Sequence, residues 1–377
     1  MKGLRELIDS PEGRLLLAEA GIFTDPHAFL AAAAPAATPL PGAEPAILPI
    51  YVHQQPCVDY RRSVAVKLRA LDAVRRVRPD AIDAVFVLID TDRAASSKAA
   101  TRIAWEDAQG RRHRLKLTPP GSDALEFRHL LVDPRQLDRI ADRLRAWLRQ
   151  MPGDRAKAIA RLDALRPLLV PADAMPMSRY AATIGSFLLD ARLDVRLRTM
   201  MVSDLADDGA LAPSLATILD GLDEFRAVFN ARVAALHAAG IETAVAEVAE
   251  DYLPLFYSCP IDGTRLRLRK RRIGGDLHAV AESPAGRRYA FPLGDRGTNL
   301  EVLYAAGRWS PDVTLPILLN DRFSGMVAGR SSALYSLVLT ATMRAALAMR
   351  PIPILVPAAL AADCPGPDGL LQAWLTG

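Results

Sequence analysis

The stretch ILPIYVHQQPCVDYRRSVAVKLRAL, Ile47 to Leu71, decides the fold prediction because it joins a strand pattern to a helix pattern. It begins with a short apolar run, which is typical of a buried strand. It ends with apolar residues near helical spacing, among which stands Lys67. Between the two patterns lies a polar cluster that includes His53, Gln54, Gln55 and Tyr60. Such a turn is either ordinary polar surface or the edge of a ligand site.

A second apolar run, AVFVLID from Ala84 to Asp90, follows this helix pattern and again leads into acidic residues. Strand, helix and strand in this order predict a right-handed crossover and a parallel sheet. We therefore predict an α/β fold with a Rossmann-like parallel sheet core. A β-hairpin over Thr101 to Leu117 and several helices up to Gly240 predict a helical excursion. Short alternating runs after Asp251 predict a small antiparallel β insert.

The 377 residues are enough for two or three structural units. We predict N-terminal helices and an Ala/Pro linker over 1–45, and the Rossmann-like core with its helical excursion over 46–250. The β insert, a connecting domain, is placed at 251–305, and the chain returns to the core over 306–377. In that return, VTLPILLND is predicted to be a sheet strand, and a helix is predicted to begin near Ser331.

Composition excludes several classes of protein. The chain is 50% hydrophobic and 24% charged, as soluble globular proteins are. No apolar run approaches the roughly 20 residues that span a bilayer, and the start does not resemble a secretory signal, so a cytoplasmic protein without membrane contact is predicted. Cys57, Cys259 and Cys364 lie far apart without metal-ligand spacing. They are therefore interpreted as reduced thiols, and no metal is predicted.

The net charge of +4 is small for a chain of this length, so a nucleic-acid partner is not expected. The one dense basic run is RLRLRKRR, Arg265 to Arg272. Its alternation is typical of the exposed face of a strand. RNA binding through this run is the least favoured hypothesis.

Polar residues follow three predicted strands at the point where each strand ends. They are His53, Gln54 and Gln55 after the first strand, Asp90 and Asp92 after the second, and Asn320 and Asp321 after the late strand. In parallel sheets, ligands bind beyond the carboxyl ends of the strands, so we predict a site there. The first turn has no glycine and the chain has no P-loop, which predicts a site built from side chains.

A second polar loop runs from Phe323 to Leu337 and contains Gly325 and Gly329. It leads into a helix whose predicted N-cap is Ser331 or Ser332. Free N–H groups at that helix start, with Arg330 beside them, predict an anion site. A plain capped turn remains the alternative.

The order of these pieces resembles the bacillithiol-biosynthesis cysteine-adding enzyme (BshC) family. The resemblance is carried by HQQ with the following helix that holds Lys67, by LIDTD, and by the late SPDVTLPILLNDRFSGMVAGRSSALYSLV. The run GLDEFRAVFNARVAALHAAGIETAVAEVAEDYLPLFY and the later GRRYAF also resemble that family in order and spacing. The resemblance covers roughly Pro45 to Pro357.

The resemblance implies a core related to the HUP nucleotide-binding superfamily and the addition of cysteine to glucosaminyl-malate, which is a condensation of a carboxylate with an amine. By position, it implies roles for Gln54, Gln55, Lys67, Asp90, Asp92, Asn320, Asp321, Gly329, Ser331 and Tyr335. The chain departs from the family in its first loop, which is glycine-rich there and here carries His53 and Pro56 to Tyr60. The family's C-terminal coiled coil is also expected to be missing, because the sequence ends about 20 residues after PIPILVP.

The favoured hypothesis is a ligase that forms a carbon–nitrogen bond between an amino acid, such as cysteine or a similar amine, and a small-molecule carboxylate. His53 or Asp92 would be the general base, with Asp90 as a further catalytic residue. Substrate would be held by Gln54, Gln55, Tyr60, Lys67, Arg330 and the late-loop residues, and ATP is the candidate cofactor. The candidate protein partners are a second copy of the chain, which would form a homodimer, and a partner enzyme. The alternatives are a non-catalytic relative that binds a metabolite or a protein, and a HUP-type nucleotidyltransferase that binds ATP near Ser331.

Overall fold

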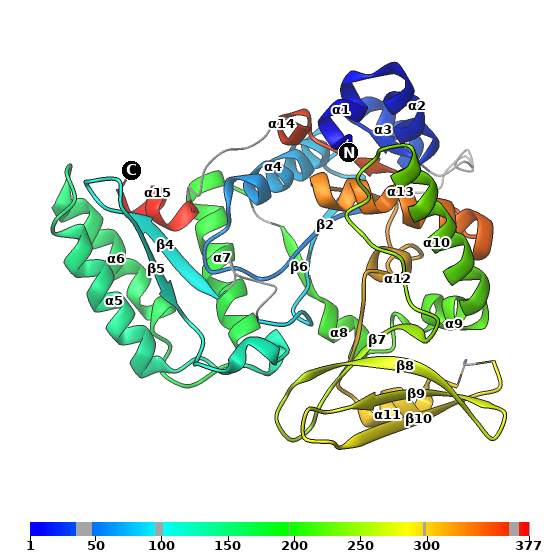
Figure 1. Ribbon diagram of the computed structural model, residues 1–377. Coiled ribbons are helices and arrows are strands. Elements are labelled where there is room, and N and C mark those ends of the chain that lie inside the picture. The colour runs from blue at the N-terminus through cyan, green and yellow to red at the C-terminus, as the bar shows by residue number, and fades with distance from the viewer. Residues whose placement is uncertain (35–46, 95–100, 196, 297–298, 362–368, 377) are drawn as a thin grey trace.

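A six-stranded sheet forms the centre of the molecule (Figure 1). The computed structural model describes residues 1–34, 47–94, 101–195, 197–296, 299–361 and 369–376. The strand order is β1-β13-β12-β2-β3-β6, and every neighbouring pair is parallel. The strands are β1 (Ile22–Phe23), β2 (Leu48–Gln54), β3 (Ile82–Leu88), β6 (Arg198–Met201), β12 (Gly325–Val327) and β13 (Ile354–Leu355). The predicted α/β fold with a Rossmann-like parallel core is confirmed.

Each face of this sheet packs against its own hydrophobic cluster. Along β2, Tyr51 packs into the cluster that contains α13 (Arg330–Ala346), whereas Ile50 and Val52 pack into the one that contains α4 (Arg62–Val77). The helix α4 leads from β2 to β3, and α13 leads from β12 to β13 on the other side of β2. These two crossovers run in opposite directions along the sheet, and right-handed crossovers of opposite direction lie on opposite faces. The direction of the strand order therefore changes between β2 and β12.

The N-terminal segment forms α1 (Leu4–Asp9), α2 (Pro11–Glu19) and α3 (Pro26–Ala33). Between α2 and α3, the short β1 pairs with β13 and so extends the main sheet. The predicted Ala/Pro linker, Ala31 to Pro45, lies for the most part outside the described residues.

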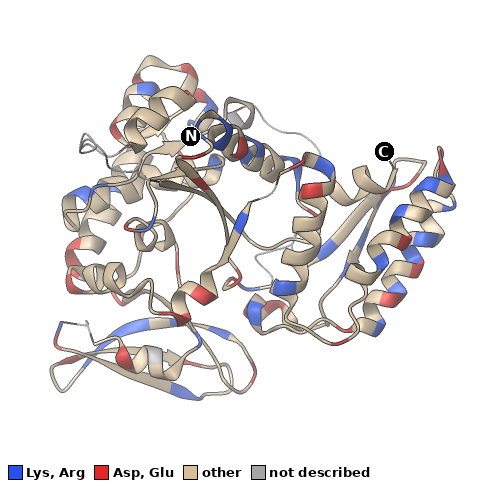
Figure 2. Ribbon diagram, turned by 180° about the vertical axis from the view of Figure 1, so that it is seen from behind, with Lys and Arg blue, Asp and Glu red and all other residues tan. Residues whose placement is uncertain are grey.

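The helical excursion between β3 and β6 begins with the predicted hairpin, β4 (Arg102–Glu106) and β5 (Arg112–Lys116). Two 3-10 turns, η1 (Ser122–Ala124) and η2 (Phe127–His129), then lead to α5 (Pro134–Leu148), α6 (Arg155–Leu169) and α7 (Met177–Leu193). Acidic and basic positions are interspersed along α5 and α6 (Figure 2). Arg145 pairs with Asp163 and Arg166 with Asp138 across these two helices.

After β6, the chain forms α8 (Val202–Asp207), α9 (Ala212–Asp220) and α10 (Leu222–Ala238). The sequence from Pro213 to Gly240 predicts one long amphipathic helix, and this prediction is wrong because the helix is interrupted at Gly221. Glycine stabilises a helix interior less than any residue except proline, so an interruption there costs little. Among the described helices, none has the length and apolarity needed to cross a membrane.

The β insert is a five-stranded antiparallel sheet of order β10-β9-β8-β7-β11. Its strands are β7 (Tyr252–Ser258), β8 (Arg265–Ile273), β9 (Asp276–Glu282), β10 (Arg288–Gly294) and β11 (Trp309–Pro311), and α11 (Glu301–Ala306) packs beside them. The predicted small antiparallel sheet is therefore confirmed. Its last strand, β11, leads directly back toward the main sheet.

The run VTLPILLND does not form the predicted strand. It contains the short helix α12 (Leu315–Leu318), with Pro316 in its first turn. The late sheet strand that was predicted here is instead β12, which lies within the predicted polar loop. A short, wholly apolar run has no periodicity that separates strand from helix. Asn320 and Asp321 consequently follow a helix, not a strand. The chain ends with α14 (Ala358–Ala361) and α15 (Leu370–Thr376).

Close packing of α7 fixes the loop that follows β2. A Cβ atom at Gly185 of α7 would lie 2.4 Å from the Cys57 carbonyl oxygen and 2.5 Å from Cε2 of Tyr60. Tyr60 is itself buried and packs against Phe86 of β3. This glycine therefore lets helix and loop approach within a distance that no side chain would permit.

We expect Gly185→Ala to lower the free energy of unfolding by about 1–3 kcal/mol, because a backbone carbonyl cannot move aside as a side chain does. Gly221→Ala is the matched control, since its Cβ would meet no atom closer than 3.6 Å. Chemical denaturation of both variants measures the difference. Equal stability of the two would contradict the close contact at Gly185.

Candidate functional site

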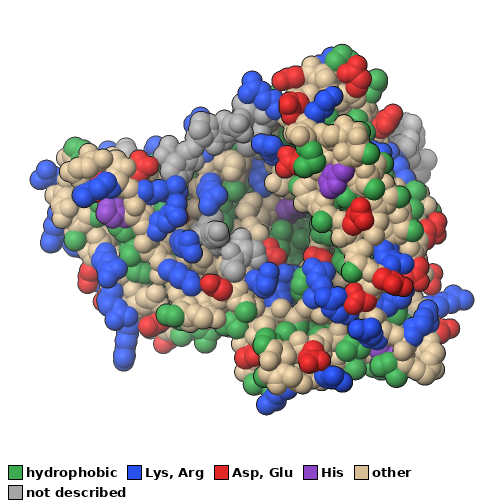
Figure 3. Space-filling view, in the orientation of Figure 1, with side chains coloured by type: hydrophobic (Ala, Val, Ile, Leu, Met, Phe, Trp, Pro, Cys, Tyr) green, Lys and Arg blue, Asp and Glu red, His purple; other side chains and the backbone are tan. Residues whose placement is uncertain are grey.

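A cavity of about 500 Å³ lies at the carboxyl edge of the main sheet, at the switch between β2 and β12. The space-filling view shows the molecule hollowed between the lobe of α5 and α6 and the part that carries α13 (Figure 3). The cavity is lined by His53, Gln54, Gln55, Lys67, Ile89, Asp92, Arg265, Pro311, Asp312, Val313, Leu315, Pro316, Ser331, Ser332 and Tyr335. Its volume falls in the range of small-molecule sites.

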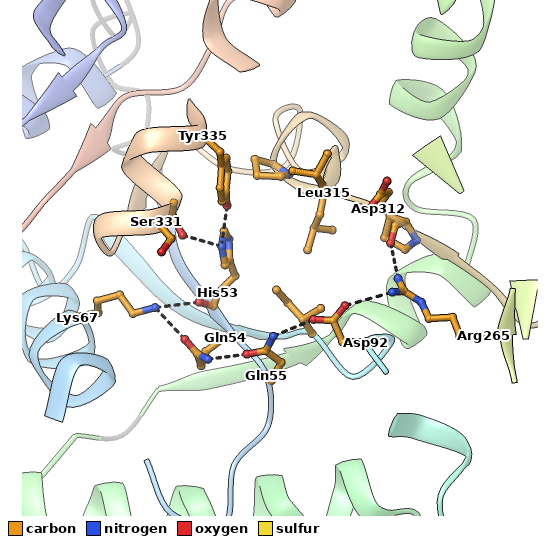
Figure 4. Close-up of a pocket in the computed structure, with 15 residues that line it drawn as sticks. His53, Gln54, Gln55, Lys67, Asp92, Arg265, Asp312, Leu315, Ser331 and Tyr335 are labelled. Atoms are coloured by element: carbon orange, nitrogen blue, oxygen red, sulfur yellow. Dashed lines mark hydrogen bonds and ion pairs between the residues drawn. The ribbon is translucent and has the colours of Figure 1, made fainter. Parts of the chain in front are cut away.

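Six parts of the fold supply the polar side chains, and one of them is the segment after β11, which carries Asp312 (Figure 4). His53 and Gln54 end β2, and Lys67 lies in the second turn of α4. Asp92 follows β3, whereas Arg265 begins β8 of the insert. Ser331, Ser332 and Tyr335 belong to the first two turns of α13. The cavity is therefore closed by the insert as well as by the main sheet.

A continuous row of hydrogen bonds crosses the cavity floor (Figure 4). The Lys67 ammonium donates to the His53 carbonyl oxygen and to Gln54 Oε1, each at 3.2 Å. Gln54 Nε2 donates to Gln55 Oε1 at 2.7 Å, and Gln55 Nε2 donates to Asp92 Oδ2 at 2.8 Å. Arg265 Nη1 then donates to Asp92 Oδ1 at 3.3 Å. The row fixes the orientation of the Gln54 and Gln55 amides. It joins the Lys67 ammonium at one end to the pair of Asp92 and Arg265 at the other.

Lys67 is buried, with 7% of its surface exposed, and among the described residues its hydrogen bonds go to a carbonyl and an amide oxygen and to no carboxylate. From the sequence alone, its place beyond the start of the helix predicts a surface or salt-bridge role unless the family resemblance holds. The structure instead places its ammonium against the end of β2. Burial lowers its pKa from 10.5 to about 8. At neutral pH it is a buried cation in a pocket, which favours an anionic ligand.

His53 does not fit the predicted role of a general base that titrates near neutrality. Burial and the charge of Lys67 lower the pKa of its imidazole from 6.5 to about 3, so the ring is neutral. Its Nε2 lies 3.0 Å from the Tyr335 hydroxyl and 3.3 Å from Ser332 Oγ. Its Nδ1 is buried and has no hydrogen-bond partner among the described residues. A neutral, oriented imidazole donates or accepts hydrogen bonds, but it is a weak base.

The start of α13 lies beside Lys67. Its N-cap is Gly329, with no side-chain cap, so the predicted N-cap at Ser331 or Ser332 is wrong. A Cβ atom on Gly329 would lie 3.5 Å from Lys67 Cδ, so the lysine stem passes along the helix start. The first N–H groups of a helix have no intrahelical acceptor and carry partial positive charge. Helix start and lysine together therefore form an electropositive end of the cavity.

Several predicted site residues do not line the cavity. Tyr60 is buried in the core, and Gly329 is the N-cap of α13 beside Lys67. Arg330 pairs with Glu242 at 3.1 Å on the surface. Asn320 binds the backbone of Arg350 and Ile352, and Asp321 accepts a hydrogen bond from Ser214.

Asp90 is buried with its carboxylate on Ser203, whose backbone N–H donates to it at 2.9 Å. Burial raises the pKa of this carboxyl, and its hydrogen bonds to Ser203 oppose the rise. It lies next to a different cavity, which also contains Arg128. In this structure Asp90 therefore holds α8 against β3.

Sequence reasoning missed Arg265, Asp312 and Ser332 as lining residues. Arg265 was interpreted as part of an exposed strand face, but its side chain is only 7% exposed. The alternation of β8 is real, with Leu266 and Leu268 buried on the opposite face. No local signal distinguishes a strand face that meets solvent from one that meets another part of the fold.

A scan of protein-family models and a search of curated proteins found no match to this chain. The resemblance to the cysteine-adding enzyme family therefore stays a prediction. Fold and site define the protein as an α/β protein with a Rossmann-like core and a polar cavity at its strand ends. Within the described residues, no group of three or more His, Cys, Asp or Glu side chains could hold a metal ion.

We expect the stability that Lys67 contributes to rise with pH. Its pKa is lower in the folded chain, so between about pH 8 and 10.5 the unfolded chain binds more protons, and folding becomes more favourable as pH increases. Relative to Lys67→Met, the free energy of unfolding of the wild type should rise by up to about 3 kcal/mol across this window. Chemical denaturation of both proteins at several pH values measures it. A difference that does not change with pH would contradict the buried ammonium.

Proposed function

We propose that the protein is a ligase that forms a carbon–nitrogen bond between an amino acid and a small-molecule carboxylate, and that the cavity at β2 and β12 is its active site. The observation that carries this proposal is the polarity of the cavity. One end presents Lys67 and the start of α13, and the other presents the carboxylate of Asp92. A ligand with separate negative and positive groups fits such a cavity.

The electropositive end suits a carboxylate or a phosphate. A buried ammonium and helix N–H groups are the groups that proteins use for such anions. Ser331 and Ser332 line the cavity at this end and offer hydroxyl donors. Tyr335 and neutral His53 add oriented hydrogen-bonding groups without adding charge.

The other end suits an amine. Asp92 is 26% exposed and accepts hydrogen bonds from Gln55 and Arg265. A carboxylate in that place can bind a substrate ammonium and accept its proton. Asp92 lies at the end of the cavity that suits the amine, so we assign the general-base role to Asp92. We assign an orienting role to His53, whose Nε2 already lies within hydrogen-bond distance of Tyr335 and Ser332.

The proposed reaction needs an activated carboxyl group, and ATP is the proposed source. The substrate carboxylate would take the terminal phosphoryl group of ATP, which releases ADP. The amine nitrogen would then bond to the carboxyl carbon, phosphate would leave with the carboxyl oxygen, and Asp92 would receive the amine proton. Lys67 and the start of α13 would hold the transferred phosphoryl group, because the negative charge of that group is largest during its transfer.

A non-catalytic relative that binds a metabolite is the second candidate. The low pKa of His53 favours it, because the group expected to act as a base does not titrate near neutrality. A binding protein would retain the polarity of the cavity without turnover.

The purified protein should convert ATP and an amino acid with a small sugar acid or hydroxy acid into an amide, ADP and phosphate, detected by mass spectrometry. Lys67→Met should weaken ATP binding by about tenfold or more, because a charged hydrogen bond is lost. Asp92→Asn should abolish amide formation while ATP still binds. Lys116→Met, at an exposed lysine on β5 that pairs with Asp123, is the control for charge.

Binding of amino acid or acid without product would favour the binding relative. Release of pyrophosphate in place of phosphate would favour a nucleotidyltransferase. Absence of binding by any of these compounds, at millimolar concentration, would contradict the proposed active site.

A further inference from the structure

Arg265 stands between two carboxylates, one in the cavity and one behind it. Its Nη1 lies 3.3 Å from Asp92 Oδ1, whereas its Nε lies 3.8 Å from Glu126 Oε1. Glu126 comes from the segment before η2 and is completely buried. Two acceptors therefore compete for one guanidinium group, and only the nearer one is bonded.

The two oxygens of Glu126 have unequal surroundings. Oε2 accepts from Arg128 Nε at 3.1 Å and from the Ser258 hydroxyl, and it lies 3.4 Å from His129 Nε2. Oε1 is buried and has no hydrogen-bond partner among the described residues. Burial alone raises the pKa of Glu126, but His129, Arg128, Arg265 and Ser258 outweigh it, so the carboxyl is ionised. A buried, charged oxygen without a partner is costly, and a small movement of Arg265 would remove that cost.

The remaining contacts of Arg265 permit such a movement. Its guanidinium carbon lies 3.7 Å from the centre of the Phe256 ring, a stacked contact that tolerates sliding in the plane. Nη2 donates to the Pro311 carbonyl oxygen at 2.9 Å, and Nε donates to Ser310 Oγ at 3.3 Å. The movement gives up two long bonds, those to Ser310 Oγ and Asp92 Oδ1 at 3.3 Å each, in exchange for Glu126, and it keeps the bond to Pro311. The charge of the guanidinium would stay paired throughout.

We propose that Arg265 is a specificity-determining residue that exchanges between Asp92 and Glu126, so that Asp92 becomes free when a substrate ammonium enters. This inference rests on the proposed function, because it assigns Asp92 to the amine. In this structure Arg265 neutralises Asp92. A ligand with an ammonium group takes its place on Asp92, and the guanidinium moves to Glu126 Oε1. A ligand without an amine cannot drive the exchange, so the cavity selects for amines.

The exchange can be tested without any ligand. In a crystal structure of Asp92→Asn, the weaker amide partner should release Arg265, and its Nε should lie within hydrogen-bond distance of Glu126 Oε1, roughly 2.7–3.2 Å. An Arg265 that stays in place against residue 92 would overturn the proposal, whatever the protein binds.

Selectivity is tested with two probes that differ only in the amine, L-cysteine and 3-mercaptopropionate, by calorimetric titration. Glu126→Gln removes the second acceptor charge, so it should weaken cysteine binding by about tenfold and leave 3-mercaptopropionate within about twofold. Arg265→Gln should increase the preference for cysteine, because Asp92 is then free from the start. Asp251→Asn is the matched control, since it breaks the pair with Arg269 on the same strand β8.

An equal effect of Glu126→Gln on both probes would overturn the assignment of Glu126 and Arg265. If the wild type binds neither probe, the proposed amino-acid substrate is wrong and the selectivity assignment falls with it. The position of Arg265 in Asp92→Asn would still report separately whether the exchange occurs.

Discussion

The buried ammonium of Lys67 is the interaction on which the candidate site depends. It ties α4 to the end of β2 through the His53 carbonyl oxygen and the Gln54 side chain. A lysine with 7% exposure and no carboxylate partner in the described part of the chain is a costly arrangement, which is found mainly at functional sites. The order of Gln54, Gln55 and Asp92 follows from it, because each amide must turn its acceptor toward the donor before it.

The second constraint is the contact between the two sheets. Asp92 belongs to the main sheet, Arg265 to the insert, and Glu126 to the excursion, and one guanidinium joins them. The backbone supports the same junction, since Phe127 N–H donates to the Asp92 carbonyl oxygen at 2.8 Å. The insert is therefore part of the cavity wall and not an appendage. Any change in its position changes which charges face the ligand.

Much of the fold could be predicted because its signals are local. The apolar runs of β2 and β3, the amphipathic pattern of α4 and the alternation of β7 to β10 each specify an element within a few residues. Prediction failed where local preference was weak. The apolar run around Leu315 to Leu318 suits helix and strand equally. The strand β12 has only three residues, begins with a glycine and is soon followed by the start of a helix. Because of both errors, Asn320 and Asp321 were predicted to follow the third strand, whereas the strand there is β12, which leads into α13 with Ser331, Ser332 and Tyr335.

The sequence by itself determined the class of fold, the end of β2 as a polar centre, and the membership of His53, Gln54, Gln55, Asp92, Ser331 and Tyr335 in one predicted site. The fold class and the membership of His53, Gln54, Gln55 and Asp92 follow from periodicity and from the rule that parallel strands end at one edge. Ser331 follows from the predicted helix start, and Tyr335 was implied only by the family resemblance. Only the tertiary structure decided that Lys67 is buried in the cavity, that His53 is neutral, and that Arg265 closes the far wall. Burial and pairing depend on residues distant in the chain, so no local pattern can carry them.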